Sequence, residues 1–215
     1  MTIRVILADD HRILREGLKT MLETQPDVEV IGEAENGRDA RDLAGELAPD
    51  IVIMDIGMPG LNGVEATRQI VSRFPGVRVL ALSMHSDKRF VSEVLRAGAC
   101  GYLLKDSAFE ELARALEAVA RGQTYLSPAI SGLVIDGFVS RSRSDSHGAA
   151  DLLTPREREV LQLIAEGAST KDVANHLHIS AKTASTHRQH IMGKLDMHSV
   201  SELTKYAIRE GLTSL

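Results

Sequence analysis

The chain has little of what marks secreted, membrane-bound or aromatic-rich nucleic-acid-binding proteins. It has one cysteine and no tryptophan in 215 residues, and aromatic side chains make up 3%. A single thiol excludes an internal disulfide framework and is typical of a reducing compartment, so we expect a cytoplasmic location. The N-terminal stretch MTIRVILADD places an acidic pair after a short apolar run, unlike a signal peptide. No apolar run approaches the ~18 residues of a membrane span, and we expect no membrane partner.

Charge is distributed unevenly along the chain. Residues 1–124 hold 15 Lys/Arg and 20 Asp/Glu, a net charge of −5, whereas residues 151–215 balance at 8 and 8. Within the second stretch, the segment from Ser180 to Leu195 contains no acid, although it holds three basic residues and two histidines. A locally basic helix in a neutral domain indicates an anionic partner, although a solvated surface would show the same pattern.

The first 122 residues alternate between two hydrophobic periods. Five short runs rich in Val, Ile and Leu predict buried strands at 3–8, 28–34, 50–55, 77–83 and 100–105. Segments with helical spacing lie between them, and Asn62 with Glu65 and Ser107 with Glu110 have the spacing of a capping box. Repeated strand–helix units predict an α/β domain, a doubly wound five-stranded parallel sheet covered on both faces.

The rest of the chain divides into a linker and a helical domain. Residues 123–150 begin with a segment that suits one short helix and continue with the Ser, Gly and Ala composition of a flexible linker. Residues 151–215 predict a small all-α domain of four helices, because Thr154, Ser169, Ser180 and Ser199 each stand where an N-cap is needed.

Polar residues stand at the carboxyl ends of the predicted strands. Asp9 and Asp10 follow the first strand, Asp55 ends the third, Ser83 ends the fourth and Lys105 ends the fifth. Ligands of doubly wound sheets bind outside these strand ends. Each residue alone has an ordinary explanation, such as a helix N-cap or an exposed strand-end charge. Together they suit a phosphoryl group: crowded carboxylates call for a hard divalent cation, and Asp55 is the candidate nucleophile.

The motifs ILADDH, VIMDIGMPGLNG, ALSMHSD and GACGYLLKD resemble the receiver domain of two-component response regulators over residues 3–121. The resemblance implies a flavodoxin-like strand order of 2-1-3-4-5, phosphorylation of Asp55 and a sensor histidine kinase as partner. It implies a Mg²⁺ or Mn²⁺ site whose residues here are Asp9, Asp10, Asp55 and Gly57 through its carbonyl. It also implies phosphoryl-binding and switch residues, which here are Ser83, Lys105 and Tyr102.

Residues 152–212 resemble the LuxR-type helix-turn-helix output domain, and the whole chain therefore resembles a NarL/FixJ-type response regulator. The resemblance implies a transcriptional regulator that binds double-stranded promoter DNA, as a homodimer when phosphorylated. The segment from Ala181 to Leu195 is the expected recognition helix, in which Ala184 replaces a Val common in the family. The candidate DNA-contacting residues on it are Lys182, Ser185, Thr186, His187, Arg188, Gln189 and Lys194, with His190 as a further candidate for backbone contact.

Other classes of protein fit less well. A dinucleotide-dependent enzyme needs a Gly-rich turn after its first strand, and LADDHRIL has none. A phosphatase of the haloacid dehalogenase type would have a second Asp two residues after the nucleophile, where Gly57 stands. We therefore do not expect an enzyme. The alternative that stays open is a receiver joined to a helical domain that binds protein instead of DNA.

Overall fold

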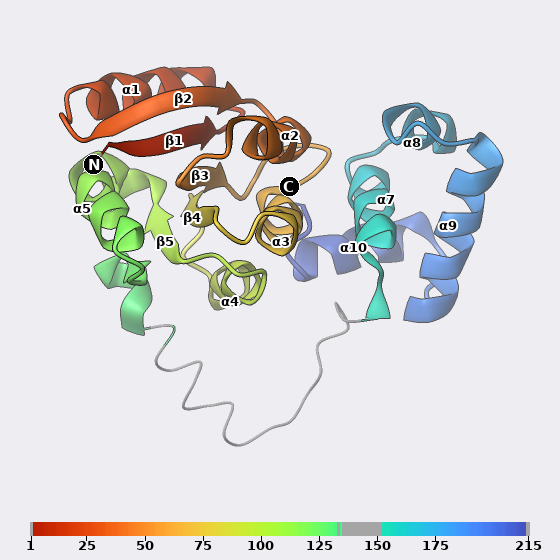
Figure 1. The fold of residues 1–215 in the computed structure, drawn as a ribbon. Coiled ribbons are helices and arrows are strands. Elements are labelled where there is room, and N and C mark those ends of the chain that lie inside the picture. The colour runs from red at the N-terminus through yellow and green to blue at the C-terminus, as the bar shows by residue number, and fades with distance from the viewer. Residues whose placement is uncertain (1, 133, 135–151, 214–215) are drawn as a thin grey trace. The chain divides into compact units, whose positions relative to one another are not determined.

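The computed structural model describes residues 2–132, 134 and 152–213. The chain forms two compact units, Met1–Arg143 and Ser144–Leu215. Figure 1 shows the first unit in red to green and the second in cyan to blue. Among the helices that the structure describes, none is both long and apolar enough to cross a membrane.

The first unit is a parallel sheet with helices on both faces (Figure 1). Its strands are β1 (Ile3–Ala8), β2 (Val28–Ala34), β3 (Ile51–Asp55), β4 (Arg78–Ser83), β5 (Gly101–Leu104) and β6 (Tyr125–Leu126). The intervening elements are α1 (Arg12–Glu23), α2 (Gly37–Leu47), α3 (Gly63–Arg73), α4 (Lys88–Arg96), the 3₁₀ turn η1 (Lys105–Ser107) and α5 (Ala108–Ala120). The strand order β2-β1-β3-β4-β5-β6 confirms the doubly wound sheet and its 2-1-3-4-5 arrangement.

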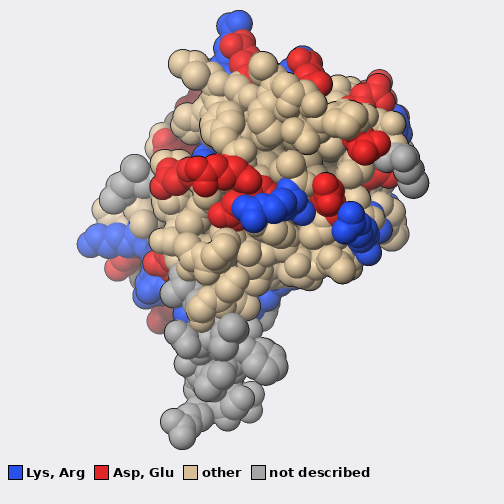
Figure 2. All heavy atoms as spheres, turned by 90° about the vertical axis from the view of Figure 1, so that its left-hand side faces the viewer, with Lys and Arg blue, Asp and Glu red and all other residues tan. Residues whose placement is uncertain are grey.

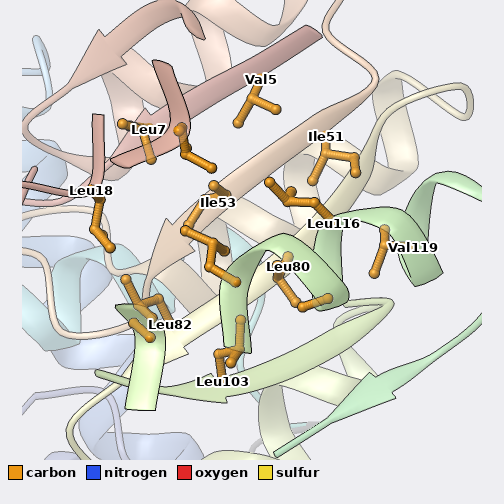
Figure 3. Packing of buried hydrophobic residues seen from close by; sticks show 14 residues of the cluster. Val5, Leu7, Leu18, Ile51, Ile53, Leu80, Leu82, Leu103, Leu116 and Val119 are labelled. Carbon is orange, nitrogen blue, oxygen red and sulfur yellow. The ribbon is translucent and has the colours of Figure 1, made fainter. Parts of the chain in front are cut away.

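Alternation along the central strands places apolar side chains on both faces of the sheet. Val5 and Leu7 of β1 pack with Leu18 of α1 and with α5 on one face (Figure 3). Their neighbours Ile6 and Ala8 pack beneath α2 and α3 on the other. Each fully buried Val, Leu or Ile contributes about 1.5–3 kcal/mol relative to exposure, so both faces hold the sheet rigidly.

Parallel register brings the polar strand ends to one edge. Ala8, the last residue of β1, lies opposite Met54 of β3. Asp9, which follows β1, and Asp55, which ends β3, are therefore at neighbouring strand ends. On the other side of β3, Asp55 lies opposite Leu82, one residue before Ser83. Ser83 in turn lies opposite Leu104, the last residue before Lys105. The buried strands thus position four predicted site residues, which are Asp9, Asp55, Ser83 and Lys105.

The sheet extends beyond residue 122, where the sequence predicted the first domain to end. β6 is a sixth strand that was not predicted, and it pairs with β5 through Tyr125 opposite Gly101. Residues 128–132 are helical, and Ile130 among them is fully buried in the core of the first unit. The first part of the predicted linker is thus folded and includes a short helix. Its remainder, residues 135–150, lies outside the described residues.

One glycine next to the strand ends has no room for a side chain. A Cβ on Gly63 would lie 2.0 Å from the carbonyl oxygen of Asp55, a backbone atom that cannot move without moving β3. Gly63→Ala should therefore lower the free energy of unfolding of the first unit by at least the ~1–3 kcal/mol of typical overpacking. Gly76→Ala is the matched control, because a Cβ there meets nothing within 4 Å. Equal urea midpoints for the two variants would contradict the close approach.

The second unit consists, in its described part, of four helices. They are α7 (Pro155–Ala165), α8 (Thr170–His176), α9 (Ala181–Leu195) and α10 (Val200–Arg209). The four predicted N-caps are confirmed: the side chains of Thr154, Ser169, Ser180 and Ser199 each accept a hydrogen bond from the N–H three residues on. The helices enclose a separate core, in which Val160, Ile191 and Leu203 are fully buried. The predicted small all-α domain is therefore confirmed.

Candidate functional site

Three aspartates and a histidine form the one group among the described residues that could hold a metal ion. Asp9, Asp10, His11 and Asp55 each offer a ligand atom, and these atoms all lie within 4.8 Å of one another. Asp9 and Asp55 are 2% and 3% exposed, whereas Asp10 and His11 are open to solvent. Buried carboxylates next to one another are costly unless a cation compensates them.

Lys105 supplies part of that compensation. Its Nζ lies 2.8 Å from Asp55 Oδ2, to which it donates a hydrogen bond, and 2.8 Å from Asp9 Oδ2 as an ion pair. Burial of the ammonium opposes its charge, but the Asp55 and Asp9 carboxylates outweigh that effect and raise the pKa of Lys105. Lys105 is therefore a fixed cation between the two buried acids.

Ser83 and Tyr102 lie on the strands beyond Asp55. Ser83 is 1% exposed, and its hydroxyl oxygen accepts a hydrogen bond from the His85 N–H at 3.0 Å. Tyr102 is fully buried, and its hydroxyl donates to the His85 carbonyl at 2.6 Å. Burial raises the pKa of Tyr102 to about 12, although a hydrogen bond with Ser83 opposes the shift. The predicted switch residue thus faces inward in this structure, beside Ser83.

Gly57 belongs to the loop that follows β3. Its N–H donates to Asp55 Oδ1 at 3.1 Å, and the residue itself is exposed. This hydrogen bond holds the loop against the Asp55 carboxylate. Carboxylate oxygens are donors that Mg²⁺ and Mn²⁺ bind, and the cluster of three aspartates therefore fits such a cation.

Sequence reasoning missed His11 as a member of the site. Its N–H donates to Asp9 Oδ1 at 2.8 Å, and its ring Nδ1 lies 2.8 Å from Asp10 Oδ1. The signal in the sequence was its position directly after the acidic pair, combined with the ability of imidazole to bind metals. The residue was overlooked because the resemblance assigns metal roles only to the aspartates and Gly57.

Acidic residues elsewhere in the first unit are paired differently. Lys19 lies 2.7 Å from Glu33, and its hydrogen bond holds the pKa of Glu33 below the usual value. Arg12 lies 2.7 Å from Glu16 on the surface of α1. Figure 2 shows acidic and basic side chains adjoining on one face of the molecule. Exposed pairs of this kind contribute little to stability, unlike the buried pairs of Lys105.

The recognition helix predicted in the second unit is α9. Ala184 and Ile191 face the core of this unit, whereas Lys182, Thr186 and Gln189 are exposed. The remaining candidates on this helix are partly or fully exposed, namely Ser185, His187, Arg188, His190 and Lys194. The helix therefore presents polar and basic side chains to solvent along most of its length.

Two of the basic candidates on α9, Lys194 and Arg188, lie next to other parts of the second unit. Lys194 Nζ lies 2.6 Å from the buried Glu157 carboxylate, which also accepts the Thr154 N–H at 2.8 Å. Burial opposes the charge of Glu157, but its hydrogen bonds with Lys194 and Thr154 prevail and lower its pKa. Arg188 lines a cavity of about 230 Å³ together with Ala184. Lys194 thus has a structural role in joining α9 to α7.

Each of the two units matches a known protein family. The family described as "Response regulator receiver domain" matches residues 5–117, and "Bacterial regulatory proteins, luxR family" matches residues 151–207. The oxygen regulatory protein NreC of Staphylococcus carnosus is 38% identical over 214 residues, which are 98% of this chain and 99% of that protein. The transcriptional regulatory protein DegU of Brevibacillus brevis is 36% identical over 222 residues, 97% of this chain and 94% of that protein.

Solved structures extend the similarity to full-length proteins. The RcsB response regulator of Salmonella typhimurium is 30% identical with a TM-score of 0.59, over 95% of this chain and 97% of that one. A structure described as two RcsB dimers bound to two parallel DNAs is 29% identical with a TM-score of 0.60, over 98% and 99%. With its receiver sheet and LuxR-type helical domain, the chain belongs to the NarL/FixJ-type two-component response regulators, a family of DNA-binding transcription regulators.

Proposed function

We propose that the chain is switched by phosphorylation of Asp55, with a sensor histidine kinase as the donor in the cytoplasm. The observation that carries this proposal is the position of Lys105, whose ammonium is held 2.8 Å from both Asp9 and Asp55 in a buried site. A phosphoryl group transferred to Asp55 would bring negative charge next to this fixed cation. Such a cation stabilises the negative charge of the phosphoryl oxygens during the transfer.

The nucleophile of the proposed chemical step is the Asp55 carboxylate. One of its oxygens forms the new P–O bond as the P–N bond to the kinase phosphohistidine breaks. The electron pair of the broken bond stays on the histidine nitrogen, which takes up a proton. Lys105 and the Ser83 hydroxyl are the proposed partners of the phosphoryl oxygens, because both are buried at the same edge of the sheet as Asp55.

A divalent cation, Mg²⁺ or Mn²⁺, is the proposed cofactor. The residues that would hold it are Asp9, Asp10, Asp55 and the Gly57 carbonyl, with Asp9 acting through a water molecule. When bound, such an ion neutralises charge on phosphoryl oxygens. The carboxylates of Asp9 and Asp10 would hold the ion beside Asp55, whose Oδ2 also pairs with Lys105.

For the output, we propose that residues 151–215 bind promoter DNA through α9. A helix-turn-helix places its second helix in the major groove. Lys182, Arg188 and Lys194, with His187 or His190 beside them, are the proposed phosphate contacts; the Glu157 pair makes Lys194 the weakest candidate of these. Ser185, Thr186 and Gln189 are the proposed base readers.

Dimerisation on DNA is proposed to use α10 of the second unit. Two copies on a two-fold site gain affinity through effective concentration, which offsets the modest charge of each recognition helix. The RcsB–DNA structure is described as containing dimers, and that resemblance supports the proposal. The chain would act as a switch whose only covalent chemistry is its own phosphorylation, so we propose no further enzymatic activity.

Two substitutions on α9 should separate base reading from phosphate contact. Gln189→Ala should cost roughly 1–3 kcal/mol of binding free energy on the preferred site and relax preference at one base position. Lys182→Ala should weaken binding to all sequences similarly and reduce the slope of log affinity against log salt by about one. Both are measured by gel shift on promoter fragments over a range of salt concentrations.

Lys88→Ala, at an exposed position in α4 of the first unit, is the matched control for loss of one positive charge. It should leave affinity and salt slope unchanged. If neither α9 variant altered affinity, base preference or salt slope, the DNA-binding face would lie elsewhere. The alternative of a helical output domain that binds protein would then be favoured.

A further inference from the structure

His11 has no part in the proposed phosphoryl transfer, although it lies at the same site. Its Nδ1 is 2.8 Å from Asp10 Oδ1, 3.3 Å from Asp9 Oδ1 and 4.0 Å from Asp55 Oδ2. Two ligands of one ion, each bound at ~2.0–2.2 Å, lie no more than about 4.4 Å apart. The imidazole nitrogen therefore lies within reach of an ion held by Asp10 and Asp55, and the Asp9 carboxylate lies beside them.

We infer that His11 is an additional side-chain ligand, which makes this site prefer first-row transition metals such as Co²⁺, Ni²⁺ or Zn²⁺ over Mg²⁺. Carboxylates alone suit Mg²⁺ and Mn²⁺, whereas imidazole suits Zn²⁺, Cu²⁺ and Ni²⁺. Mg²⁺ takes oxygen ligands and keeps several waters, so it gains nothing from a nearby nitrogen. The inference rests on the proposed function only in placing a cation among Asp9, Asp10 and Asp55.

The backbone holds His11 in position for this role. The residue is the N-cap of α1 with an extended backbone, and its N–H donates to Asp9 Oδ1 at 2.8 Å. Its side chain makes no capping hydrogen bond and is 67% exposed. The ring can therefore turn towards an ion without disturbing the core or the start of α1. The same contacts would arise if His11 were only a charged neighbour of the acids, and metal selectivity distinguishes the two roles.

The test measures Co²⁺ and Mg²⁺ binding to the full chain by calorimetry, with the visible absorption of Co²⁺ as a second readout. His11→Ala removes the nitrogen without removing a capping bond. Loss of an outer-sphere partner of a ligand costs roughly 10- to 100-fold in metal affinity, and loss of the ligand itself should cost at least as much for Co²⁺. The Co²⁺ spectrum should change as well, while Mg²⁺ affinity stays nearly constant.

His198→Ala is the control, because His198 is an exposed histidine of the second unit; it should leave the affinity and spectrum of the Asp9–Asp10–Asp55 site unchanged. His11→Asn provides a second variant if the Ala substitution impairs folding. Unchanged Co²⁺ binding in the His11 variants, or equal losses for Co²⁺ and Mg²⁺, would overturn the inference. Since no phosphodonor is present, a failure of Asp55 to accept phosphate would not affect the result.

Discussion

Asp55→Asn should abolish phosphorylation of the full chain by a histidine kinase or by a small phosphodonor with Mg²⁺. The amide is a far weaker nucleophile than the carboxylate, and it removes one negative charge from the cation site. The fold should persist, because Lys105 keeps its ion pair with Asp9 at 2.8 Å and an amide oxygen can still accept the Gly57 N–H. Intact-protein mass spectrometry measures the added phosphoryl group.

Asp42→Asn is the matched control for this experiment. Asp42 lies on α2 with a side chain that is 62% exposed and paired with Arg41, so its replacement removes an acid away from the strand ends. The control should accept phosphate as the wild type does. An undiminished acyl phosphate on Asp55→Asn would contradict the assignment of the acceptor and would direct attention to Asp9 or Asp10.

Lys105→Met should destabilise the first unit strongly at neutral pH. Removing one partner of a buried ion pair leaves the other uncompensated and typically costs about 3–5 kcal/mol. Here the loss leaves two carboxylates, Asp9 and Asp55, without the ammonium that lies between them. Mg²⁺ should restore part of the lost stability, because the ion can compensate the same charges. Urea unfolding with and without Mg²⁺ measures both effects.

Lys19→Met controls for loss of a surface lysine, since Lys19 pairs with Glu33 in a partly exposed position; it should have a small effect that Mg²⁺ does not reverse. The pH dependence provides a second check. Because the folded pKa of Lys105 lies above its ordinary value of 10.5, its contribution to stability is complete below that value. The contribution is lost as the pH rises through the folded pKa, and Lys105→Met should lack this alkaline loss. A variant as stable as the wild type without Mg²⁺ would contradict the role of Lys105.

The sheet and the helical unit could be predicted because their signals are local. Residues such as Ile51 to Met54 form an apolar run that only a strand buried on both faces accommodates, and all are fully buried. The four N-caps of the second unit could be predicted for the same reason. A Ser or Thr side chain caps a helix by accepting a hydrogen bond from the backbone N–H only three residues away.

Features that depend on contacts distant in the sequence were not predictable in the same way. β6 spans only Tyr125–Leu126, too short for a periodic signal, and it is held by β5 and by the Tyr125 hydroxyl on Glu111. The capping box predicted at Ser107 is wrong: η1 precedes α5, and the Ser107 hydroxyl donates to Leu104 instead. A 3₁₀ turn formed by the residues after β5 was not visible in the pattern.

For the candidate sites, the positions of residues at strand ends could be predicted, but their ion-pair and hydrogen-bond partners could not. The sequence placed Asp9, Asp55 and Lys105 at the same edge, and the structure brings them into contact. The ion pair of Lys194 with Glu157 joins residues 37 positions apart, so a helical pattern that counts Lys194 only as basic cannot anticipate it. His11 was missed for a different reason, since the resemblance assigns metal roles only to the aspartates and Gly57.

The central claim is that phosphorylation of Asp55 in the first unit controls DNA binding by the second. The most direct measurement is the affinity of the full chain for promoter DNA at one salt concentration, with and without a small phosphodonor and Mg²⁺, in the wild type and in Asp55→Asn. Allosteric coupling is typically 1–3 kcal/mol, so the phosphodonor should tighten binding by the wild type about 5- to 150-fold and leave the variant unchanged. Equal affinities of the wild type with and without phosphodonor, under conditions in which mass spectrometry shows that it is phosphorylated, would contradict the account.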